Sequence, residues 1–376
     1  MLVFVSNVVS PHTIPLSVEL NNKLKGEFMF IETRMMAEVR KKMGYNSLSS
    51  LPFVVPYDQY IHDTTHYKAI IDNAEVVLAS YGSIDNSLLE NRVTENKLTF
   101  LLSERLFKKG ILKLFDPKLW RTIYYLSRIR NKAFYLLCMG AYVARDFCLC
   151  GFPKDKTYTF GYITQQSTAP VKETRITTTI KLLWVGRMIW WKQPFDAIKA
   201  ALKLKEMGYD VELEMIGGGK LENKVRKYIM KHDHYGCVKY SGLQQSEVVQ
   251  NKMSSCDILL CTSNRLEGWG AVINEGLSAG CLVVANIMMG AAPSLIRDGE
   301  NGYVYKGRAR SLTKVIKKAI DSKRHVEIGE NGRNYIKEMW SPIIAADRLI
   351  NLINELKTDK HSSFCYKEGI CSKSQK

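Results

Sequence analysis

The sequence predicts an α/β protein with two domains, each a doubly wound parallel sheet with helices on both faces. Two observations favour this fold class. Short apolar runs alternate with segments of helical periodicity along most of the 376 residues, and this is the pattern of right-handed crossovers between parallel strands. The length also exceeds what one hydrophobic core usually organises. We therefore expect one domain over residues 1–168 and a second over residues 176–338.

Both halves of the chain show this alternation. In the first half, a helical segment covers 14–25 and the strand-like runs are 2–6, 28–33, 76–80, 98–102 and 134–139. The second half is more regular, with strand-like runs at 180–186, 211–216, 238–242, 256–263, 282–286 and 302–306.

The segments outside these runs have their own character. The polar, Thr-rich segment 165–179 is typical of an interdomain linker. A last helix is expected over 341–357, packing back on the first domain. The Lys- and Ser-rich segment 358–376 predicts a disordered tail.

The composition favours anionic partners but does not identify which kind of anionic partner binds. A net charge of +17 and a pI near 9.3 favour anionic partners such as nucleic acid, an acidic membrane surface or phosphorylated substrates. The nine cysteines form no CxxC pair and suit small buried hydrophobes in a reducing compartment. The N-terminus lacks signal-peptide features, and the longest apolar run, 134–144, is too short to span a bilayer. We expect a cytoplasmic protein, and a peripheral position on the inner face of the cell membrane stays open.

Two cations follow the first strand of the second half. Arg187 and Lys192 lie in the loop after the strand that ends at Gly186, and Pro194 suits the first turn of the next helix. Ligands of doubly wound sheets bind beyond the carboxyl ends of the strands. The two cations are therefore candidates for holding a diphosphate and stabilising it as a leaving group. Taken alone, they are better explained as solvated surface cations.

A second cluster of residues favours ligand binding over the interpretation as solvated surface cations. The strand-like run 256–263 is followed by a loop through Glu267 and Gly270, and a helix is expected from about Ala271. Glycine before a helix N-terminus lets a phosphate approach bare N–H groups. Glu267 and Glu275 are eight residues apart, roughly 12 Å of helical rise, so their carboxylates suit opposite ends of a nucleotide sugar, whose hydroxyls donate to carboxylates. A plain turn and an exposed helix residue are the alternative, but they leave a single carboxylate among small residues unexplained.

The spacing E-x7-E, followed by a helix of small residues and a VVA strand, resembles the retaining glycosyltransferases of family 4, which have the GT-B fold. The resemblance covers roughly residues 180–310 and includes GGGKLE, YSGLQQSEV and GAAPSLIRDGENGYVY in the same order. It implies two Rossmann-like domains that face one another across a cleft. It also implies a nucleotide sugar, UDP-linked, as the donor.

The resemblance implies roles for single residues on the donor side. Arg187 and Lys192 should hold the donor diphosphate. Glu267 should contact donor-sugar hydroxyls near the reacting carbon, and Glu275 should accept from the ribose hydroxyls. The main chain should face the diphosphate at Gly270, Ala271 and Val272, and should meet the base near Gly242 and Leu243.

The first half looks like a subgroup of bacterial polysaccharide-assembly transferases, through SNVVSPHTIPL, FLLSERLFKKG, YLLCMGAYVARDF and FGYIT. This implies that the first domain receives a glycan or lipid-linked glycan acceptor. Many relatives have a glycine-rich first loop and a histidine after a mid-domain strand, whereas this chain has Asn7 and His12 at the first place and Glu104 at the second. All three are acceptor-side candidates, and Glu104 is also a catalytic candidate. An ion pair of Glu104 with Arg105 or with Lys108–Lys109 explains that residue equally well.

The sequence gives no reason to expect a metal or another cofactor. It contains no Asp-x-Asp, the carboxylate pair that usually holds Mg²⁺ or Mn²⁺ on a diphosphate, and its seven histidines form no HExxH. The GGGKLE segment lacks GKS/T, so a plain strand-to-helix turn is the better interpretation. Trp184 suits the core, whereas Trp190 and Trp191 are candidates for lining the cleft or the domain interface.

The segment 104–135 is both basic and apolar. Nine Lys and Arg stand against Glu104 and Asp116, a net charge of +7, with Leu, Ile, Phe, Tyr and Trp between them. Such a segment suits the headgroup region of an anionic membrane and would attract a lipid-linked acceptor. A charged outer face over a buried apolar one explains it equally well. The regular aromatic spacing of a nucleic-acid binder is missing, so nucleic acid is not expected.

Together these patterns predict a metal-independent glycosyltransferase. It would move a sugar from a nucleotide sugar to a surface or capsular polysaccharide, or to a lipid-linked glycan, with retention of configuration. One alternative is a UDP-sugar epimerase on the same fold, for which we identify no acid or base residues. The other is a non-catalytic module that binds membrane or nucleic acid on a degenerate version of the fold, and the intact Arg187, Lys192, Glu267 and Glu275 argue against it.

Overall fold

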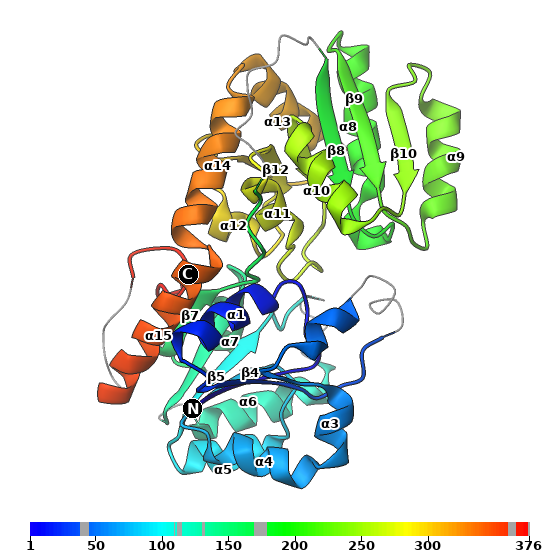
Figure 1. The fold of residues 1–376 in the computed structure, drawn as a ribbon. Coiled ribbons are helices and arrows are strands. Elements are labelled where there is room, and N and C mark those ends of the chain that lie inside the picture. The colour runs from blue at the N-terminus through cyan, green and yellow to red at the C-terminus, as the bar shows by residue number, and fades with distance from the viewer. Residues whose placement is uncertain are drawn as a thin grey trace. The chain divides into compact units, whose positions relative to one another are not determined.

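The chain folds into two α/β units, each with its own parallel sheet (Figure 1). The computed structural model describes residues 1–37, 45–108, 110, 115–129, 132–168, 179–359 and 366–374. The N-terminal unit comprises residues 1–165 and 339–376, and the C-terminal unit comprises residues 166–338.

The N-terminal unit contains a seven-stranded sheet of order β3-β2-β1-β4-β5-β6-β7. All of these strands pair in parallel. Its elements are β1 (Leu2–Ser6), α1 (Ile14–Lys23), β2 (Phe28–Glu32), β3 (Val54–Val55), α3 (Tyr57–His62), α4 (Thr64–Asn73), β4 (Val76–Ser80), α5 (Asn86–Thr94), β5 (Leu98–Ser103), α6 (Pro117–Ile129), β6 (Phe134–Met139), α7 (Val143–Leu149), β7 (Thr157–Phe160) and α15 (Pro342–Thr358).

The C-terminal unit contains a six-stranded parallel sheet of order β10-β9-β8-β11-β12-β13. Its elements are β8 (Ile180–Val185), α8 (Pro194–Glu206), β9 (Val211–Ile216), α9 (Glu222–His232), β10 (Val238–Gly242), α10 (Ser246–Ser255), β11 (Ile258–Cys261), α11 (Val272–Ser278), β12 (Leu282–Asn286), α12 (Ala292–Leu295), β13 (Tyr303–Tyr305), α13 (Ala309–Asp321) and α14 (His325–Met339).

The cores explain why the strands are almost uninterrupted apolar runs. Parallel strands covered by helices on both faces are buried on both sides, and every residue of β1, β5, β6, β11 and β12 is buried. In the C-terminal unit, α8 and α13 pack against each other and share one core with β8, β9 and β12. In the N-terminal unit, α4, α5 and α6 lie on one side of the sheet, with α1 on the other (Figure 1).

The predicted fold class is confirmed, because both halves form doubly wound parallel sheets. In each sheet the strand order reverses next to the unit's first strand, between β1 and β4 and between β8 and β11. Ligands of doubly wound sheets bind at such switch points, beyond the carboxyl ends of the strands. Most of the predicted linker, residues 169–178, lies outside the described residues. That the two domains face one another across a cleft stays a prediction.

The C-terminal end of the chain belongs to the N-terminal unit. Helix α15 packs against α1 (Figure 1). The prediction of a disordered tail over 358–376 is wrong for residues 366–374. There, Cys371 N donates to Thr159 O over 2.8 Å and Thr159 N donates to Ser372 O over 2.7 Å, so the segment pairs with β7. Arg348 in α15 donates to two carbonyls of the same segment, which helps to hold it.

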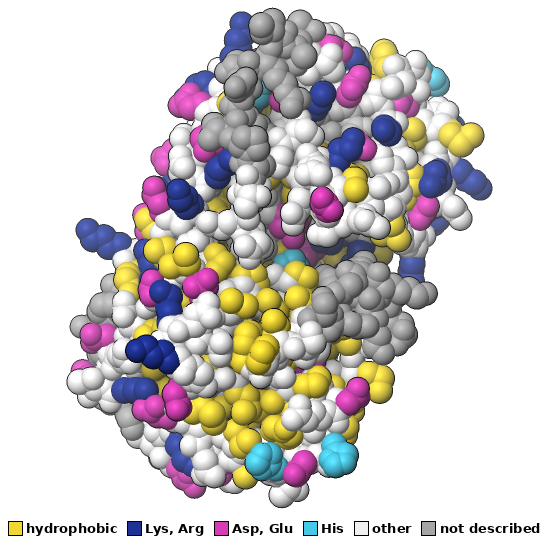
Figure 2. Space-filling view, viewed as in Figure 1, with side chains coloured by type: hydrophobic (Ala, Val, Ile, Leu, Met, Phe, Trp, Pro, Cys, Tyr) yellow, Lys and Arg dark blue, Asp and Glu magenta, His cyan; other side chains and the backbone are white. Residues whose placement is uncertain are grey.

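Hydrophobic side chains are not confined to the interior. On the face shown in Figure 2, they gather in a broad patch on the N-terminal unit, whereas Lys and Arg are spread over both units. No helix within the described ranges is long and apolar enough to cross a bilayer.

Candidate functional site

The loop that follows β8 brings the two predicted cations to the switch point of the C-terminal unit. Arg187 lies just beyond the strand, exposed, with its guanidinium 5.8 Å from the centre of the Trp191 ring. A short 3₁₀ turn, Trp190–Lys192, follows and presents Lys192. Gln193 then adopts a left-handed backbone (φ 51°), and Pro194 begins α8 as predicted. The turn therefore places both cations at the carboxyl edge of the sheet.

A buried chain of hydrogen bonds fixes this turn to the next strand of the switch point. Trp184 Nε1 in β8 donates to Thr262 Oγ1 over 2.8 Å, and the Thr262 hydroxyl donates to the Lys192 carbonyl over 2.6 Å. Thr262 directly follows β11 and is buried. The backbone of Lys192 is thus held from the core side, and its side chain extends to Glu267.

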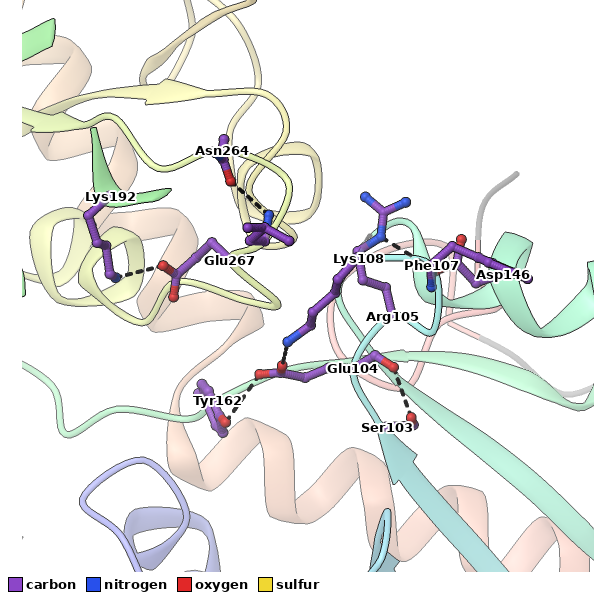
Figure 3. Close-up of polar contacts among 11 residues, drawn as sticks. Ser103, Glu104, Arg105, Phe107, Lys108, Asp146, Tyr162, Lys192, Asn264 and Glu267 are labelled. Carbon is purple, nitrogen blue, oxygen red and sulfur yellow. Dashed lines mark hydrogen bonds and ion pairs between the residues drawn. The ribbon is translucent and has the colours of Figure 1, made fainter. Parts of the chain in front are cut away.

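Lys192 and Glu267 form an ion pair. The ammonium Nζ lies 2.7 Å from Glu267 Oε2, and the two side chains are only 14% and 17% exposed (Figure 3). Glu267 comes from the loop after β11, where its N–H donates to the Asn264 carbonyl over 3.0 Å and the Asn264 N–H donates to the Trp191 carbonyl over 2.8 Å. The two clusters predicted from sequence therefore form one site.

Close backbone packing explains the glycine-rich segment after β9. A Cβ atom on Gly217, whose φ is +137°, would lie 1.9 Å from the Gly186 carbonyl oxygen. Met188 N donates to Gly218 O over 2.8 Å, and Leu221 N donates to Met188 O over 2.8 Å. The segment is thus a strand-to-helix turn, as predicted, and it also supports the loop that contains Arg187.

The predicted base-binding residues lie at the end of β10, beside this turn. The Gly242 carbonyl accepts from Gly217 N over 2.8 Å, so it is engaged within the protein. The Leu243 side chain is largely exposed and lies against Gly218. Main chain at both residues therefore sits at the same sheet edge as Arg187.

The segment between the two glutamates differs from the expectation. Helix α11 begins only at Val272, and Glu267 lies in the preceding loop, so the estimate of helical rise between Glu267 and Glu275 does not apply. Gly270, two residues before the helix, has a φ of +99°, and a Cβ there would meet Met289 Cε at 2.5 Å. Glu275 lies in the first turn of α11, where its N–H donates to the Ala271 carbonyl over 3.0 Å.

The carboxyl edge of the N-terminal sheet is hollow. A cavity of about 680 Å³ opens at its switch point, and all of its lining residues belong to that unit. Most come from β1, β4, β5 and the loops that follow them, and the others are Leu119 of α6, Met139 of β6 and Tyr162. The three predicted acceptor-side residues, Asn7, His12 and Glu104, all line it. Serine and threonine side chains contribute as well, at Ser6, Ser10, Thr13, Ser80 and Ser103. Asn7 Oδ1 is buried and has no hydrogen-bond partner among the described residues, so a ligand hydroxyl would satisfy it.

Glu104 is held by its neighbours inside the cavity. Its Oε2 accepts from Lys108 Nζ, and its Oε1 lies 3.4 Å from the Tyr162 hydroxyl (Figure 3). Arg105 turns instead to Asp146, with 3.4 Å between Nε and Oδ2, and its guanidinium lies 4.9 Å from the centre of the Tyr142 ring. Of the ion pairs weighed for Glu104, the structure contains the one with Lys108. Lys109 lies outside the described residues.

One buried cysteine lies at the end of a strand at the switch point of the C-terminal unit. Cys261 ends β11 and is buried, and burial strongly raises the pKa of its thiol, so the thiol stays neutral. Within the described ranges, no group of three His, Cys, Asp or Glu side chains is arranged to hold a metal ion.

Several residues that contribute to these contacts carry no functional signal in the sequence. Thr262 carried no signal beyond its place at the end of a buried strand. Tyr162 lies in the FGYIT segment, which contributes to the family resemblance but predicts no contact with Glu104. Trp184 was expected in the core, and it is buried, but its indole N–H also begins the hydrogen-bond chain to Lys192.

Comparisons with known proteins concern the family and the fold of the chain. Residues 165–335 match the model of the family described as glycosyl transferases group 1. An uncharacterized glycosyltransferase of Methanocaldococcus jannaschii is 26% identical over 258 residues, which cover 66% of this chain and 63% of the relative. The amylovoran biosynthesis glycosyltransferase AmsK of Erwinia amylovora is 29% identical over 143 residues, which cover 36% of this chain and 35% of the relative. The chain thus spans between about a third and two thirds of these relatives.

A solved structure extends the likeness to the whole fold. HepE of Anabaena, in complex with UDP, has a TM-score of 0.70 with 14% sequence identity, over 94% of this chain and 98% of that chain. The protein therefore has the GT-B fold, and its residues 165–335 are similar to the glycosyl transferases of group 1.

Proposed function

We propose that the protein is a glycosyltransferase that uses a nucleotide sugar, UDP-linked, as its donor. The observation that carries the proposal is the ion pair between Lys192 and Glu267, 2.7 Å apart at the switch point of the C-terminal sheet, with Arg187 on the same loop. The match of residues 165–335 to glycosyl transferases group 1 and the likeness to the fold of HepE, which binds UDP, support it.

The proposed donor site uses charge for the diphosphate and carboxylates for the sugars. Arg187 and Lys192 bind the diphosphate, Glu267 contacts the donor sugar, and Glu275 accepts from the ribose hydroxyls. Carboxylates suit vicinal hydroxyls because each oxygen accepts hydrogen bonds. The main chain completes the site, with the diphosphate facing Gly270, Ala271 and Val272 and the base facing Gly242 and Leu243.

The proposed chemistry is substitution at the anomeric carbon. The bond from that carbon to the diphosphate oxygen breaks, a bond to an acceptor hydroxyl oxygen forms, and nucleoside diphosphate and a proton are released. Negative charge grows on the departing diphosphate, and fixed cations stabilise it. We assign that task to Arg187 and Lys192 without a metal ion. Retention of configuration follows from the resemblance to family 4.

The acceptor is proposed to bind in the N-terminal cavity. Its hydroxyl-rich lining, with Asn7, His12 and Glu104, suits the hydroxyls of a glycan. We propose a surface polysaccharide or a lipid-linked glycan as the acceptor, because AmsK is named for the biosynthesis of a polysaccharide. A capsular polysaccharide biosynthesis glycosyltransferase of Staphylococcus aureus is a further relative, 25% identical over 175 residues.

Thermal shift with a panel of nucleotides tests the donor. A ligand that binds the folded state raises apparent stability by about 2.7 kcal/mol at 100 times its Kd. We expect UDP and a UDP-sugar to raise the melting temperature of the full chain, and GDP and ADP to raise it less. Lys192→Ala should abolish the shift. Lys252→Ala, which breaks another ion pair of the same unit, 2.8 Å long with Glu214, should keep it. If no sugar nucleotide stabilises the protein, or if Lys252→Ala loses the shift equally, the proposal is wrong.

A further inference from the structure

The outward face of α6 carries a group of large exposed side chains that the proposed glycosyl transfer does not use. Phe115, just before the helix, is 81% exposed, and Trp120 and Tyr124 are 59% and 66% exposed. Trp120 and Tyr124 are four residues apart and therefore lie above one another on the same face of the helix. Single exposed hydrophobic residues are ordinary on protein surfaces, but a group of aromatic residues on one helix face calls for an explanation.

The opposite face of α6 explains why these residues must point outward. Leu119, Leu126 and Ile129 are buried, and Ile123 packs against the same core, which includes residues of β5 and β6. Their spacing of three or four residues places these side chains in one buried stripe, as in an amphipathic helix. Because the stripe fixes the rotation of α6, Trp120 and Tyr124 do not turn into the core without exposing these residues.

Cations lie among the outward aromatic residues. Arg121 is exposed next to Trp120. Arg128 is also exposed, with its guanidinium 5.8 Å from the centre of the Tyr124 ring and 3.2 Å from Glu90. The chain as a whole has a net charge of +17. An acidic partner surface therefore complements this face in charge.

We propose that the outward face of α6 docks on the headgroup region of an anionic lipid bilayer. Trp and Tyr suit that region because the ring is apolar while the N–H or O–H end is polar. Arginine beside them is attracted to anionic headgroups. The helix would lie in the plane of the interface, as amphipathic helices with aromatic and basic residues do. The residues 109, 111–114, 130 and 131 lie outside the described part of the chain and form no part of this proposal.

The proposal goes beyond glycosyl transfer and stands independently of it. Membrane docking would place the N-terminal cavity near a lipid-linked acceptor, but α6 needs neither donor nor acceptor in order to bind lipid. A protein that docks and transfers no sugar, or transfers sugar and does not dock, separates the two proposals.

Sedimentation of the full chain with vesicles tests the docking. We expect binding to vesicles that contain phosphatidylglycerol, little binding to vesicles of phosphatidylcholine alone, and weakening as salt rises. Trp120→Ala combined with Tyr124→Ala should weaken binding to the anionic vesicles about tenfold, and Arg121→Glu by a similar factor. These side chains are exposed, so we expect the variants to keep the melting temperature of the parent chain.

Matched controls come from the C-terminal unit. Tyr235→Ala and Lys239→Glu also remove an exposed aromatic residue and an exposed cation, and they should bind vesicles as the parent chain does. Equal binding to both kinds of vesicle, no binding at low salt, or equal losses in the controls would overturn the proposal. So would binding to nucleic acid without binding to vesicles, or self-association that Trp120→Ala abolishes, because each would assign the face to another partner.

Discussion

The two units share a strand order around their switch points, but the carboxyl edges of their sheets are built differently. In the C-terminal unit, the loops after β8, β9 and β11 are tied to one another by backbone hydrogen bonds, by the Thr262 hydroxyl and by the ion pair of Lys192 with Glu267. In the N-terminal unit, the corresponding loops leave a cavity of about 680 Å³. The N-terminal loops are also tied to one another, for example by Val9 N, which donates to Glu32 Oε1 over 2.6 Å, but they enclose an open cavity.

This difference suggests a division of labour within the proposed function. A donor with a diphosphate and two sugar rings presents the same groups in every turnover, so fixed charges can be placed for it in advance. A glycan acceptor offers mainly hydroxyls, and a hydroxyl-lined cavity binds such groups with fewer fixed contacts. We therefore expect substitutions on the donor side to cost more activity than substitutions in the N-terminal cavity.

The largest effect is expected from Glu267→Ala. Glu267 is assigned to the donor sugar, so its loss should abolish most transfer while leaving affinity for the nucleoside diphosphate nearly intact. Glu275→Ala is the matched control, since it should weaken nucleotide binding instead. Calorimetry with UDP alone decides between them, because a reversed pattern would exchange the two assignments.

Arg187→Ala and Lys192→Ala should each lower turnover by about 10²-fold or more, as other losses of charge stabilisation in the transition state do. Because we propose that these cations take the place of a metal ion, activity should survive a chelator. The measurement is the initial rate with and without chelator, for the parent chain and both variants. A strict requirement for Mg²⁺ or Mn²⁺ would contradict the assignment.

How well the sequence predicts the sheets and the contacts at their carboxyl edges depends on the kind of contact. The sheets were predictable because parallel strands buried on both faces are continuous apolar runs. The edge strand β3 was missed because two residues are too few to show a pattern, and β7 was missed because Thr157 and Thr159 interrupt its apolar residues. The donor residues were placed by their positions after strands and by the resemblance, but the ion pair of Lys192 with Glu267 joins residues far apart in the chain.

The contacts that sequence analysis missed are long-range and polar. The hydrogen bonds of Thr262 depend on where β8 and β11 meet, which no local pattern records. Residues 366–374 looked disordered because they are polar, yet backbone pairing with β7 and the donors of Arg348 order them. The local ion pair of Glu104 is a different case, because the sequence offered both Arg105 and Lys108 as partners and the fold decides for Lys108.

Thr262→Val sharpens the comparison from the donor side. The variant keeps the shape of the side chain and removes the hydroxyl, so the Trp184 indole N–H and the Lys192 carbonyl lose their partner, which costs about 1–3 kcal/mol for a buried group. We expect UDP affinity and turnover each to fall roughly tenfold, because Lys192 is no longer held in position. Both quantities are measured at a temperature well below the melting temperature of the variant. Thr262→Ser restores the hydroxyl and should restore both quantities. Equal losses in the serine variant would show that packing of the methyl group, and not the hydrogen-bond chain, positions Lys192.

Glu104→Gln should have the smallest effect, and it tests whether the N-terminal cavity takes part in the reaction at all. The substitution removes the charge that pairs with Lys108 and keeps a group that can still accept from Tyr162. If Glu104 contacts the acceptor, kcat/KM for the acceptor should fall a few-fold, whereas affinity for UDP should not change. Glu90→Gln is the matched control, because Glu90 pairs with Arg128 on the surface, away from the cavity lining. A loss of kcat at saturating acceptor would extend the role of Glu104 from binding to catalysis. Kinetics identical to the parent chain, both below and at saturating acceptor, would leave Glu104 as the ion-pair partner of Lys108 and remove it from the proposed acceptor site.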